Sequence, residues 1–171
     1  MWIFGFGSLM TDGWEVKFGC TSREVGGLVG YRRVFNKLPV KNWGTHDCPC
    51  PTLNLEATAG AKCVGVAFEF NDSRNTEVIA YLVEREGKNF RPHEVNATLR
   101  DGRSIVARVW IYEGKYVFPT NEPETLLHAV RHATGSRGTC YNYVEKICAQ
   151  LAKVGIDDPA VTQLWRAVSS Q

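Results

Sequence analysis

One acidic side chain, Glu86, is predicted to lie on the buried face of a helix. The helix should run from about Arg74 to Glu86, because Asn71-Asp72-Ser73 offers N-cap side chains and Gly87 is a typical helix stop. Residues that share the inward face are three or four positions apart along such a helix. The inward stripe combines four apolar residues with one acid: Val78, Ile79, Leu82, Val83 and Glu86.

A carboxylate at the buried end of a helix is disfavoured as an anion. Burial removes it from water, and the last helical turn carries the negative end of the helix dipole. Both effects raise the pKa of Glu86 toward the range that suits an acid or base catalyst near neutral pH. Glu77 and Glu84 fall on the other side of the helix. The residues alone leave a second interpretation open, in which Glu86 only forms an ion pair with a nearby cation: Arg85, Lys88 or Arg91.

The first ten residues offer a second kind of chemistry. Trp2 to Phe6 is a short apolar run typical of a buried strand, and it ends in Gly7-Ser8. A sharp turn there would point consecutive backbone N–H groups outward, which suits a carboxylate or an oxyanion. The stretch lacks the third glycine of a dinucleotide fingerprint and the Gly-Lys-Ser/Thr of a P-loop. It also lacks the Gly-x-Ser-x-Gly of a nucleophile elbow. A core strand followed by a plain turn remains the alternative.

Two stretches resemble signatures of the gamma-glutamylcyclotransferases, above all of the ChaC-like, glutathione-specific branch. Trp-Ile-Phe-Gly-Phe-Gly-Ser-Leu (2–9) is similar to the opening signature, although Phe6 stands where the family usually has Tyr. Tyr-Leu-Val-Glu-Arg-Glu (81–86) is similar to the second signature, in which the glutamate after the arginine is the acid/base residue. The resemblance therefore assigns this role to Glu86, the residue that the helical pattern also selects.

The resemblance implies an α+β fold, a mixed small β-barrel with flanking helices, and one cyclotransferase domain over residues 1–171. It implies cleavage of a γ-glutamyl compound, with glutathione as the first expectation, by intramolecular cyclisation and without a cofactor. A γ-glutamylamine or γ-glutamyl amino acid is the alternative substrate, and a binding module without turnover is the alternative function. Substrate binding falls to Phe6, Gly7, Ser8 and Leu9 and to a tyrosine five residues after a Gly-rich turn, Tyr143.

Tyr143 belongs to a second predicted helix, from about Thr139 to Val154, after the break at Gly135 to Gly138. The stripe Tyr143, Ile147, Leu151 places the phenol inward near the helix N-terminus, where backbone dipoles favour an anion. A core aromatic whose hydroxyl reaches water is the alternative interpretation.

Two clusters of metal-binding residue types occur. His46-Asp47-Cys48-Pro49-Cys50 contains Cys-x-Cys, which is not a zinc-knuckle spacing, and no second pair completes four ligands. His128 and His132 share a helix face between Pro123 and Thr134, but no third ligand is evident. We therefore expect no metal, and we expect residues 37–51 to form a loop that borders or covers the site.

Composition gives no sign of nucleic acid or membrane partners. The chain has 171 residues, with 20 basic and 18 acidic side chains and a net charge of +2, and no apolar stretch approaches the length of a bilayer span. No secretory signal is evident, so the six cysteines are expected to be free thiols in a cytoplasmic protein. We expect a single soluble domain whose partner is a small molecule; the oligomeric state is not readable.

The remaining elements are predicted from local patterns. Thr11 to Gly27 has no clean period and should cross the surface. Strands are expected at 28–35, 51–56 and 62–70, with a turn at Ala59-Gly60, and a hairpin of 94–100 and 104–112 should turn at Asp101-Gly102. Asp157-Asp158-Pro159 should cap a last helix through Trp165.

Overall fold

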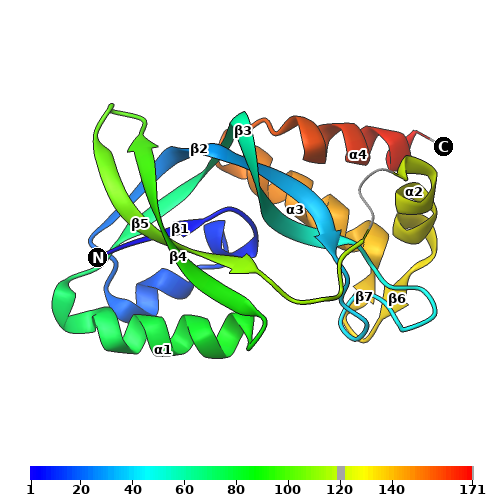
Figure 1. Ribbon diagram of the computed structural model, residues 1–171, viewed down its shortest axis with the longest axis horizontal. Helices are drawn as coiled ribbons and strands as arrows, with labels where there is room; N and C mark the ends of the chain where they lie inside the picture. Colours follow the sequence, from blue (N-terminus) through cyan, green and yellow to red (C-terminus); the bar gives the residue numbers. More distant parts are fainter. Residues whose placement is uncertain (119–121, 171) are drawn as a thin grey trace. The chain divides into compact units, whose positions relative to one another are not determined.

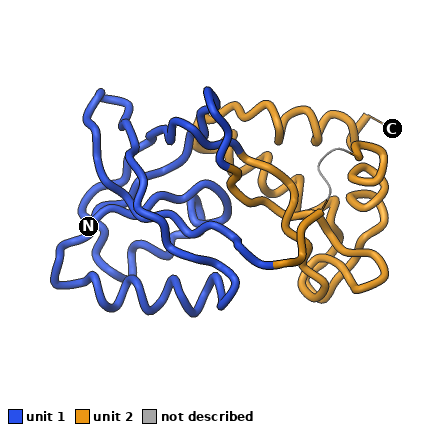
Figure 2. The backbone as a smooth tube through the Cα atoms, in the orientation of Figure 1, with its two compact units in different colours: residues 1–32, 57–114 blue, residues 33–56, 115–171 orange. Residues whose placement is uncertain are grey.

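The computed structural model describes residues 1–118 and 122–170, which form two units (Figure 2). Unit 1 comprises Met1–Arg32 and Ala57–Gly114, and unit 2 comprises Arg33–Glu56 and Lys115–Gln171. Each unit consists of two separate stretches because two long strands, β2 (Ser22–Lys37) and β3 (Thr52–Glu69), begin in one unit and end in the other.

The strands form a closed barrel in the order β1-β3-β2-β4-β5 (Figure 1). The other three strands belong to unit 1: β1 (Trp2–Gly5), β4 (Phe90–Leu99) and β5 (Ser104–Tyr112). Strand β1 pairs antiparallel with β3 and parallel with β5, so that Trp2 lies opposite both Glu69 and Ala107. Fully buried apolar side chains lie on both faces of these strands, since neighbours such as Ile3 and Phe4 point in opposite directions: Ile3, Phe4, Val66, Phe68 and Val109. The predicted α+β barrel is confirmed.

The strand predictions were partly wrong. The expected turn at Ala59-Gly60 does not exist, because β3 runs unbroken through it. Gly60 has a φ of +76°, which a glycine adopts without strain, and its exposed neighbours resemble a turn in sequence. The predicted irregular segment 11–27 also contains regular structure. It holds the 3-10 helix Trp14–Phe18, which buries both aromatic rings, and the first part of β2.

The predicted hairpin and first helix are confirmed. Strands β4 and β5 pair from Phe90↔Tyr112 to Thr98↔Ser104, with Gly102 at positive φ in the turn. Helix α1 (Asn75–Glu86) follows the 3-10 turn Asp72–Arg74 and ends at Gly87, whose φ is +85°. These bounds differ by one residue from the predicted ones.

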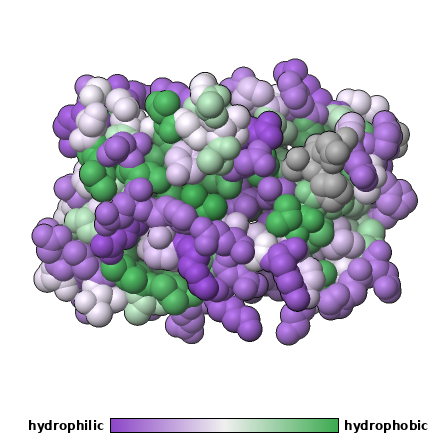
Figure 3. All heavy atoms as spheres, in the orientation of Figure 1, coloured by the Kyte–Doolittle hydropathy of each residue, from purple (hydrophilic) through white to green (hydrophobic). Residues whose placement is uncertain are grey.

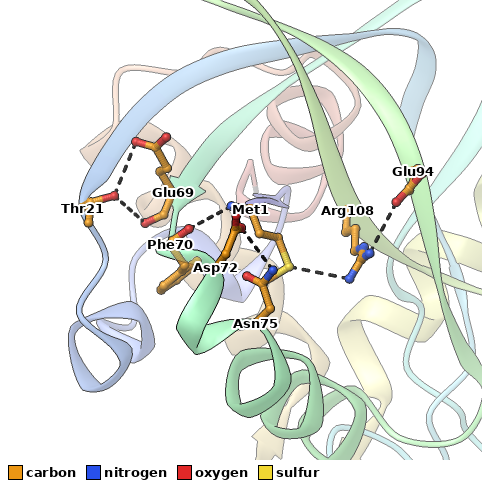
Figure 4. Close-up of polar contacts among 8 residues, drawn as sticks. All are labelled: Met1, Thr21, Glu69, Phe70, Asp72, Asn75, Glu94 and Arg108. Carbon is orange, nitrogen blue, oxygen red and sulfur yellow. Dashed lines mark hydrogen bonds and ion pairs between the residues drawn. The ribbon is translucent and has the colours of Figure 1, made fainter.

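The chain's amino terminus is fixed beside the start of α1 (Figure 4). The Met1 amino group donates a hydrogen bond of 2.8 Å to the Phe70 carbonyl oxygen and lies 3.4 Å from the Asp72 carboxylate. Asn75 donates to the same carboxylate at 3.2 Å, and Arg108 of β5 contacts the Met1 sulfur at 3.6 Å. These contacts tie the first residue to the residue that follows β3, to β5 and to the 3-10 turn before α1.

Unit 2 holds the other helices. They are α2 (Pro123–His132), α3 (Cys140–Lys153) and α4 (Pro159–Ser169), with a small hairpin of β6 (Thr134–Gly135) and β7 (Gly138–Thr139) before α3. As predicted, Asp158 caps the last helix, accepting hydrogen bonds from the N–H groups of Ala160 and Val161. Its other oxygen forms an ion pair of 2.8 Å with Arg33, whose side chain is fully buried.

The expectation of six free thiols was wrong for two of them. Cys50 and Cys140 form a disulfide that joins the loop before β3 to the first residue of α3. The spacing of six cysteines does not specify which sulfurs meet in space, and both partners here are fully buried. The other four cysteines are not disulfide-bonded: Cys20, Cys48, Cys63 and Cys148.

The loop that carries Cys50 packs against the small hairpin of unit 2. The Arg137 N–H donates to the Asn42 carbonyl oxygen at 2.7 Å, and a Cβ at Gly135 would lie 2.6 Å from the backbone nitrogen of Trp43. Only glycine fits at that contact, so the hairpin and the loop are in direct backbone contact.

Hydrophilic residues cover much of the face shown in Figure 3, where apolar residues appear in separate groups. Among residues 1–118 and 122–170, no helix has the length and hydropathy that a bilayer crossing requires.

Candidate functional site

The loop after β1 is held tightly against the end of its own strand. Residues Ser8–Met10 form a 3-10 turn in which Met10 N–H donates to the Gly7 carbonyl oxygen at 3.0 Å. A Cβ at Gly5 would lie 3.1 Å from the Leu9 Cβ atom and 3.3 Å from the Phe68 ring, so glycine allows this close return. At the start of such a turn, the N–H groups of Ser8 and Leu9 have no carbonyl partner within it.

The side chains of this loop divide into buried and exposed ones. Phe6 and Leu9 are 8% and 7% exposed and belong to the core, whereas Ser8 is exposed. A ligand at this loop would therefore meet the Ser8 hydroxyl and the backbone N–H groups. For Phe6 and Leu9, the predicted binding role can involve only their backbone.

Glu86 continues the buried row of α1. Val78 and Leu82 are fully buried, and Glu86 follows at the same spacing of four as the last residue of the helix. Its side chain is 18% exposed, and its Oε1 atom lies 3.5 Å from Arg85 Nε. Both interpretations of the sequence thus describe part of the geometry, since the carboxylate is mostly buried and also has a cationic neighbour.

Arg85 connects Glu86 to the loop after β1. Its Nη2 atom donates to the Ser8 hydroxyl oxygen at 3.3 Å and to the Asp12 carboxylate, and its Nη1 atom donates to the Tyr81 hydroxyl oxygen at 3.2 Å. One guanidinium therefore contacts the loop, the segment after it and the carboxylate of Glu86. The structure brings Ser8 and Glu86, two of the predicted site residues, into one network within unit 1.

The Arg85 side chain is charged throughout the ordinary pH range. Burial disfavours the charged guanidinium, but the hydrogen bonds to Asp12 and Tyr81 and the negative charges of Asp12 and Glu86 raise the pKa of Arg85 above its usual value. The carboxylate of Glu86 thus has a permanent cation beside it, which favours its anionic form and opposes the effect of burial.

Trp14 supports the same region from the other side. Its indole N–H donates to the Leu9 carbonyl oxygen at 3.0 Å, and its ring stacks on Tyr81 with centroids 5.9 Å apart and planes 12° apart. Phe18 packs against the Tyr81 ring at 5.1 Å. These aromatic residues fix the phenol that receives the Arg85 hydrogen bond.

Sequence reasoning missed Asp12, Trp14 and the contacts of Arg85. The Arg85–Asp12 contact joins residues 73 positions apart, and Asp12 lies in a segment without periodicity. Only the aromatic residues of that segment gave a signal, because two large rings three to four positions apart can share a buried helical face.

Tyr143 lies in unit 2, in the first turn of α3, whereas Gly7, Ser8 and Glu86 lie in unit 1. The Leu53 N–H donates to its hydroxyl oxygen at 2.9 Å, and the Trp43 ring lies 5.5 Å away. Thr139 caps this helix by accepting from Asn142 N–H at 3.1 Å. The half-buried phenol has the predicted position at the start of the helix, and its role toward a ligand stays a prediction.

Neither cluster of metal-binding residue types gains a full ligand set. Cys50 is bound in a disulfide, so the loop from His46 loses one thiolate. The rings of His128 and His132 lie 4.4 Å apart on one face of α2, as predicted. Among residues 1–118 and 122–170, no three His, Cys, Asp or Glu side chains group to hold a metal ion.

The closed barrel with flanking helices is the fold of solved gamma-glutamyl cyclotransferase structures. The crystal structure of the yeast gamma-glutamyl cyclotransferase specific to glutathione matches with a TM-score of 0.83 and 18% identity, over 99% of this chain and 96% of that chain. At this identity the likeness shows the fold alone.

The family model described as ChaC-like protein matches residues 1–171, so the chain belongs to this family. Gamma-glutamylcyclotransferase 2-3 of Arabidopsis thaliana is 29% identical over 98% of the chain and 88% of its own length. The glutathione-specific gamma-glutamylcyclotransferase of Escherichia coli (strain K12) is also 29% identical, over 98% of the chain and 72% of its own length. The resemblance noted in the two sequence stretches is thereby confirmed.

Proposed function

We propose that this protein is a gamma-glutamylcyclotransferase that converts glutathione to 5-oxoproline and Cys-Gly. Its family and the names of its relatives in Arabidopsis thaliana and Escherichia coli support this activity. The single observation that carries the proposal is the network in unit 1, where Arg85 contacts both the Ser8 hydroxyl and the Glu86 carboxylate. An acid/base residue and an anion-binding loop are the two parts that the reaction needs.

The reaction needs no external nucleophile, because the substrate contains one. The α-amino nitrogen of the glutamyl group attacks the γ-carbonyl carbon, a new C–N bond closes the five-membered ring, and the C–N bond to the Cys-Gly amine breaks. Holding the glutamyl chain folded makes this attack intramolecular and well oriented. The enzyme is then a carbon–nitrogen lyase that works without a cofactor.

Glu86 moves the protons. Its carboxylate takes a proton from the α-ammonium, which frees the lone pair for attack, and returns a proton to the departing amide nitrogen. Burial and the helix end disfavour the anion, whereas the guanidinium of Arg85 favours it. A carboxylate positioned beside the reacting groups can accept a proton in one step and release it in the next.

The loop from Gly7 to Leu9 stabilises negative charge. The N–H groups of Ser8 and Leu9, which have no carbonyl partner within the turn, are suited to an oxyanion or to the substrate carboxylate, and preorganised amides contribute strongly because they do not need to reorient during the reaction. The exposed Ser8 hydroxyl adds a polar contact. Tyr143 is a further predicted partner of the substrate, and its test is separate because it lies in unit 2.

We also propose that residues 1–171 act as one catalytic domain in the cytoplasm, where glutathione is the main thiol buffer. The disulfide counts against this location, because such bonds are rare in the cytosol. Fractionation of cells that express the tagged protein would test the location.

A substrate panel tests the proposed activity. Purified protein should release 5-oxoproline from glutathione faster than from γ-glutamyl-alanine or a γ-glutamylamine, as measured by chromatography of the product. Release of 5-oxoproline only from γ-glutamyl-alanine or the γ-glutamylamine would show that glutathione is not the substrate. Binding without release from any of them would favour a non-catalytic module on the same fold.

A further inference from the structure

We propose that Arg85 is a positioning residue that fixes the loop after β1 and the carboxylate of Glu86 relative to each other. This inference rests on the proposed function for its catalytic consequence. The geometry on which it stands lies within unit 1 and does not depend on the identity of the substrate.

The guanidinium of Arg85 uses different nitrogens for different partners. The proximal Nε atom lies 3.5 Å from Glu86 Oε1. The two terminal nitrogens extend away from the helix to Ser8, Asp12 and Tyr81. This division is possible because the planar guanidinium presents five donors in a fixed arrangement, which a lysine ammonium cannot reproduce.

A closed ring of contacts removes the freedom of the loop. The path runs from the Leu9 carbonyl to the Trp14 indole, by stacking to Tyr81, by a hydrogen bond to Arg85, and from Arg85 to Ser8. The loop is therefore held at two adjacent residues, once through its backbone and once through a side chain. Because Arg85 and Glu86 both belong to α1, a displacement of this helix would move Glu86 together with the Arg85 side chain that contacts Ser8.

Arg85 also sets the charge that Glu86 meets. The charged and titratable groups around Glu86 in this network are Arg85 and the phenol of Tyr81 on α1, Asp12 after the loop, and Lys17, whose Nζ lies 5.5 Å from the Tyr81 ring centroid. Asp12 pairs with the same guanidinium, so loss of Arg85 would leave two carboxylates without their shared cation. The anionic form of Glu86 would then be less favourable, and activity that requires it would need a higher pH.

Three variants separate these effects. Arg85→Gln removes the charge and most of the donors, Arg85→Lys keeps the charge but not the planar donor arrangement, and Arg74→Gln is the matched control. Arg74 lies at the start of α1 and forms an exposed ion pair with Glu77 at 2.9 Å. Thermal unfolding and circular dichroism first establish that all three variants are folded.

Hydrogen exchange measures the positioning directly, without reference to activity. Peptides covering residues 5–12 should exchange at least tenfold faster in Arg85→Gln, with the barrel peptides unchanged, and Arg74→Gln should match the wild type. Unchanged exchange at 5–12 in Arg85→Gln would overturn the proposal. Faster exchange in a protein that turns over no γ-glutamyl compound would uphold the positioning role and reject the proposed function.

The pH profile of 5-oxoproline release then tests the catalytic consequence. In Arg85→Gln, kcat/KM should fall at least 100-fold and its acid limb should move to higher pH, because an opposite charge is lost. Arg85→Lys should keep the wild-type acid limb while KM rises, because the charge remains and the grip on the loop is lost. If both variants lose kcat/KM equally and the acid limb does not move, Arg85 does not set the charge state of Glu86 and the proposed catalytic consequence is wrong.

Discussion

Removal of the Cys50–Cys140 disulfide should cost more stability than any single packing defect in unit 2. The two residues are 90 positions apart. In the chain-entropy account, cross-linking such a loop restricts the unfolded chain and raises its free energy by about 4.6 kcal/mol at 25 °C. Measured effects often fall below this value. We therefore expect the Cys50→Ala/Cys140→Ala variant to lose ~2–4 kcal/mol of unfolding free energy.

Urea denaturation measures this loss. The double variant should unfold at a lower urea concentration and with a steeper slope, because its unfolded chain is more expanded. Cys63→Ala is the control, since Cys63 is as fully buried as the paired cysteines but is not cross-linked. It should cost about 1 kcal/mol, the usual size of a small packing defect.

Alkylation with mass spectrometry tests the disulfide itself. The denatured, non-reduced protein should label at four cysteines, and the reduced protein at all six. In the folded protein the disulfide should resist mild reductants, because both sulfur-bearing residues are fully buried. Labelling at six sites without reduction, or equal stability of the double variant and the wild type, would refute the reasoning.

Further predictions concern the barrel, unit 2 and acid stability. Gly5→Ala adds a Cβ for which the returning loop leaves little room, so it should cost about 1–3 kcal/mol in urea unfolding and lower activity; wild-type values for both would contradict the close contact. Asp158→Ala leaves Arg33 buried without this carboxylate and uncaps α4, and should cost about 3–5 kcal/mol, whereas a cost below 1 would contradict the buried pair. Hydrogen bonds from Asn75 and the chain's amino group, with the charge of that group, lower the pKa of Asp72. Its stabilising effect should therefore be present above about pH 4, which is the pKa of an aspartate in the unfolded chain. The effect should be lost as the pH falls through the lower pKa of Asp72 in the folded protein. Thermal melts of wild type and Asp72→Asn from pH 2 to 6 should converge at low pH, and a constant difference would contradict this.

The parts of the fold that local patterns specify were predicted well. The 3.6-residue period and Gly87 defined α1, and the same period placed Glu86 on the buried side with Val78 and Leu82. Val83 was wrongly placed on the inward stripe, because this residue is 50% exposed. Asp101-Gly102 located the hairpin of β4 and β5, since that dipeptide tolerates the positive φ that the turn needs.

Features that depend on distant residues could not be predicted. The exposed middle of β3 contains Gly60 and resembles a turn, although it pairs within a long strand. The disulfide and the Arg85–Asp12 contact join residues 90 and 73 positions apart, and no local pattern encodes such pairs. The loop after β1 was correctly expected to turn after the first strand, but its anchors on Trp14 and Arg85 required the folded structure.

The release of 5-oxoproline by Glu86→Gln tests the central claim most directly. Glutamine keeps the shape of the side chain but cannot shuttle a proton. Glu84→Gln is the matched control, because Glu84 lies on the exposed side of the same helix. With glutathione as substrate, the wild type and Glu84→Gln should release 5-oxoproline at similar rates, while folded Glu86→Gln should lose at least 1,000-fold in kcat. Turnover by Glu86→Gln within tenfold of the wild type would contradict the assigned role of Glu86.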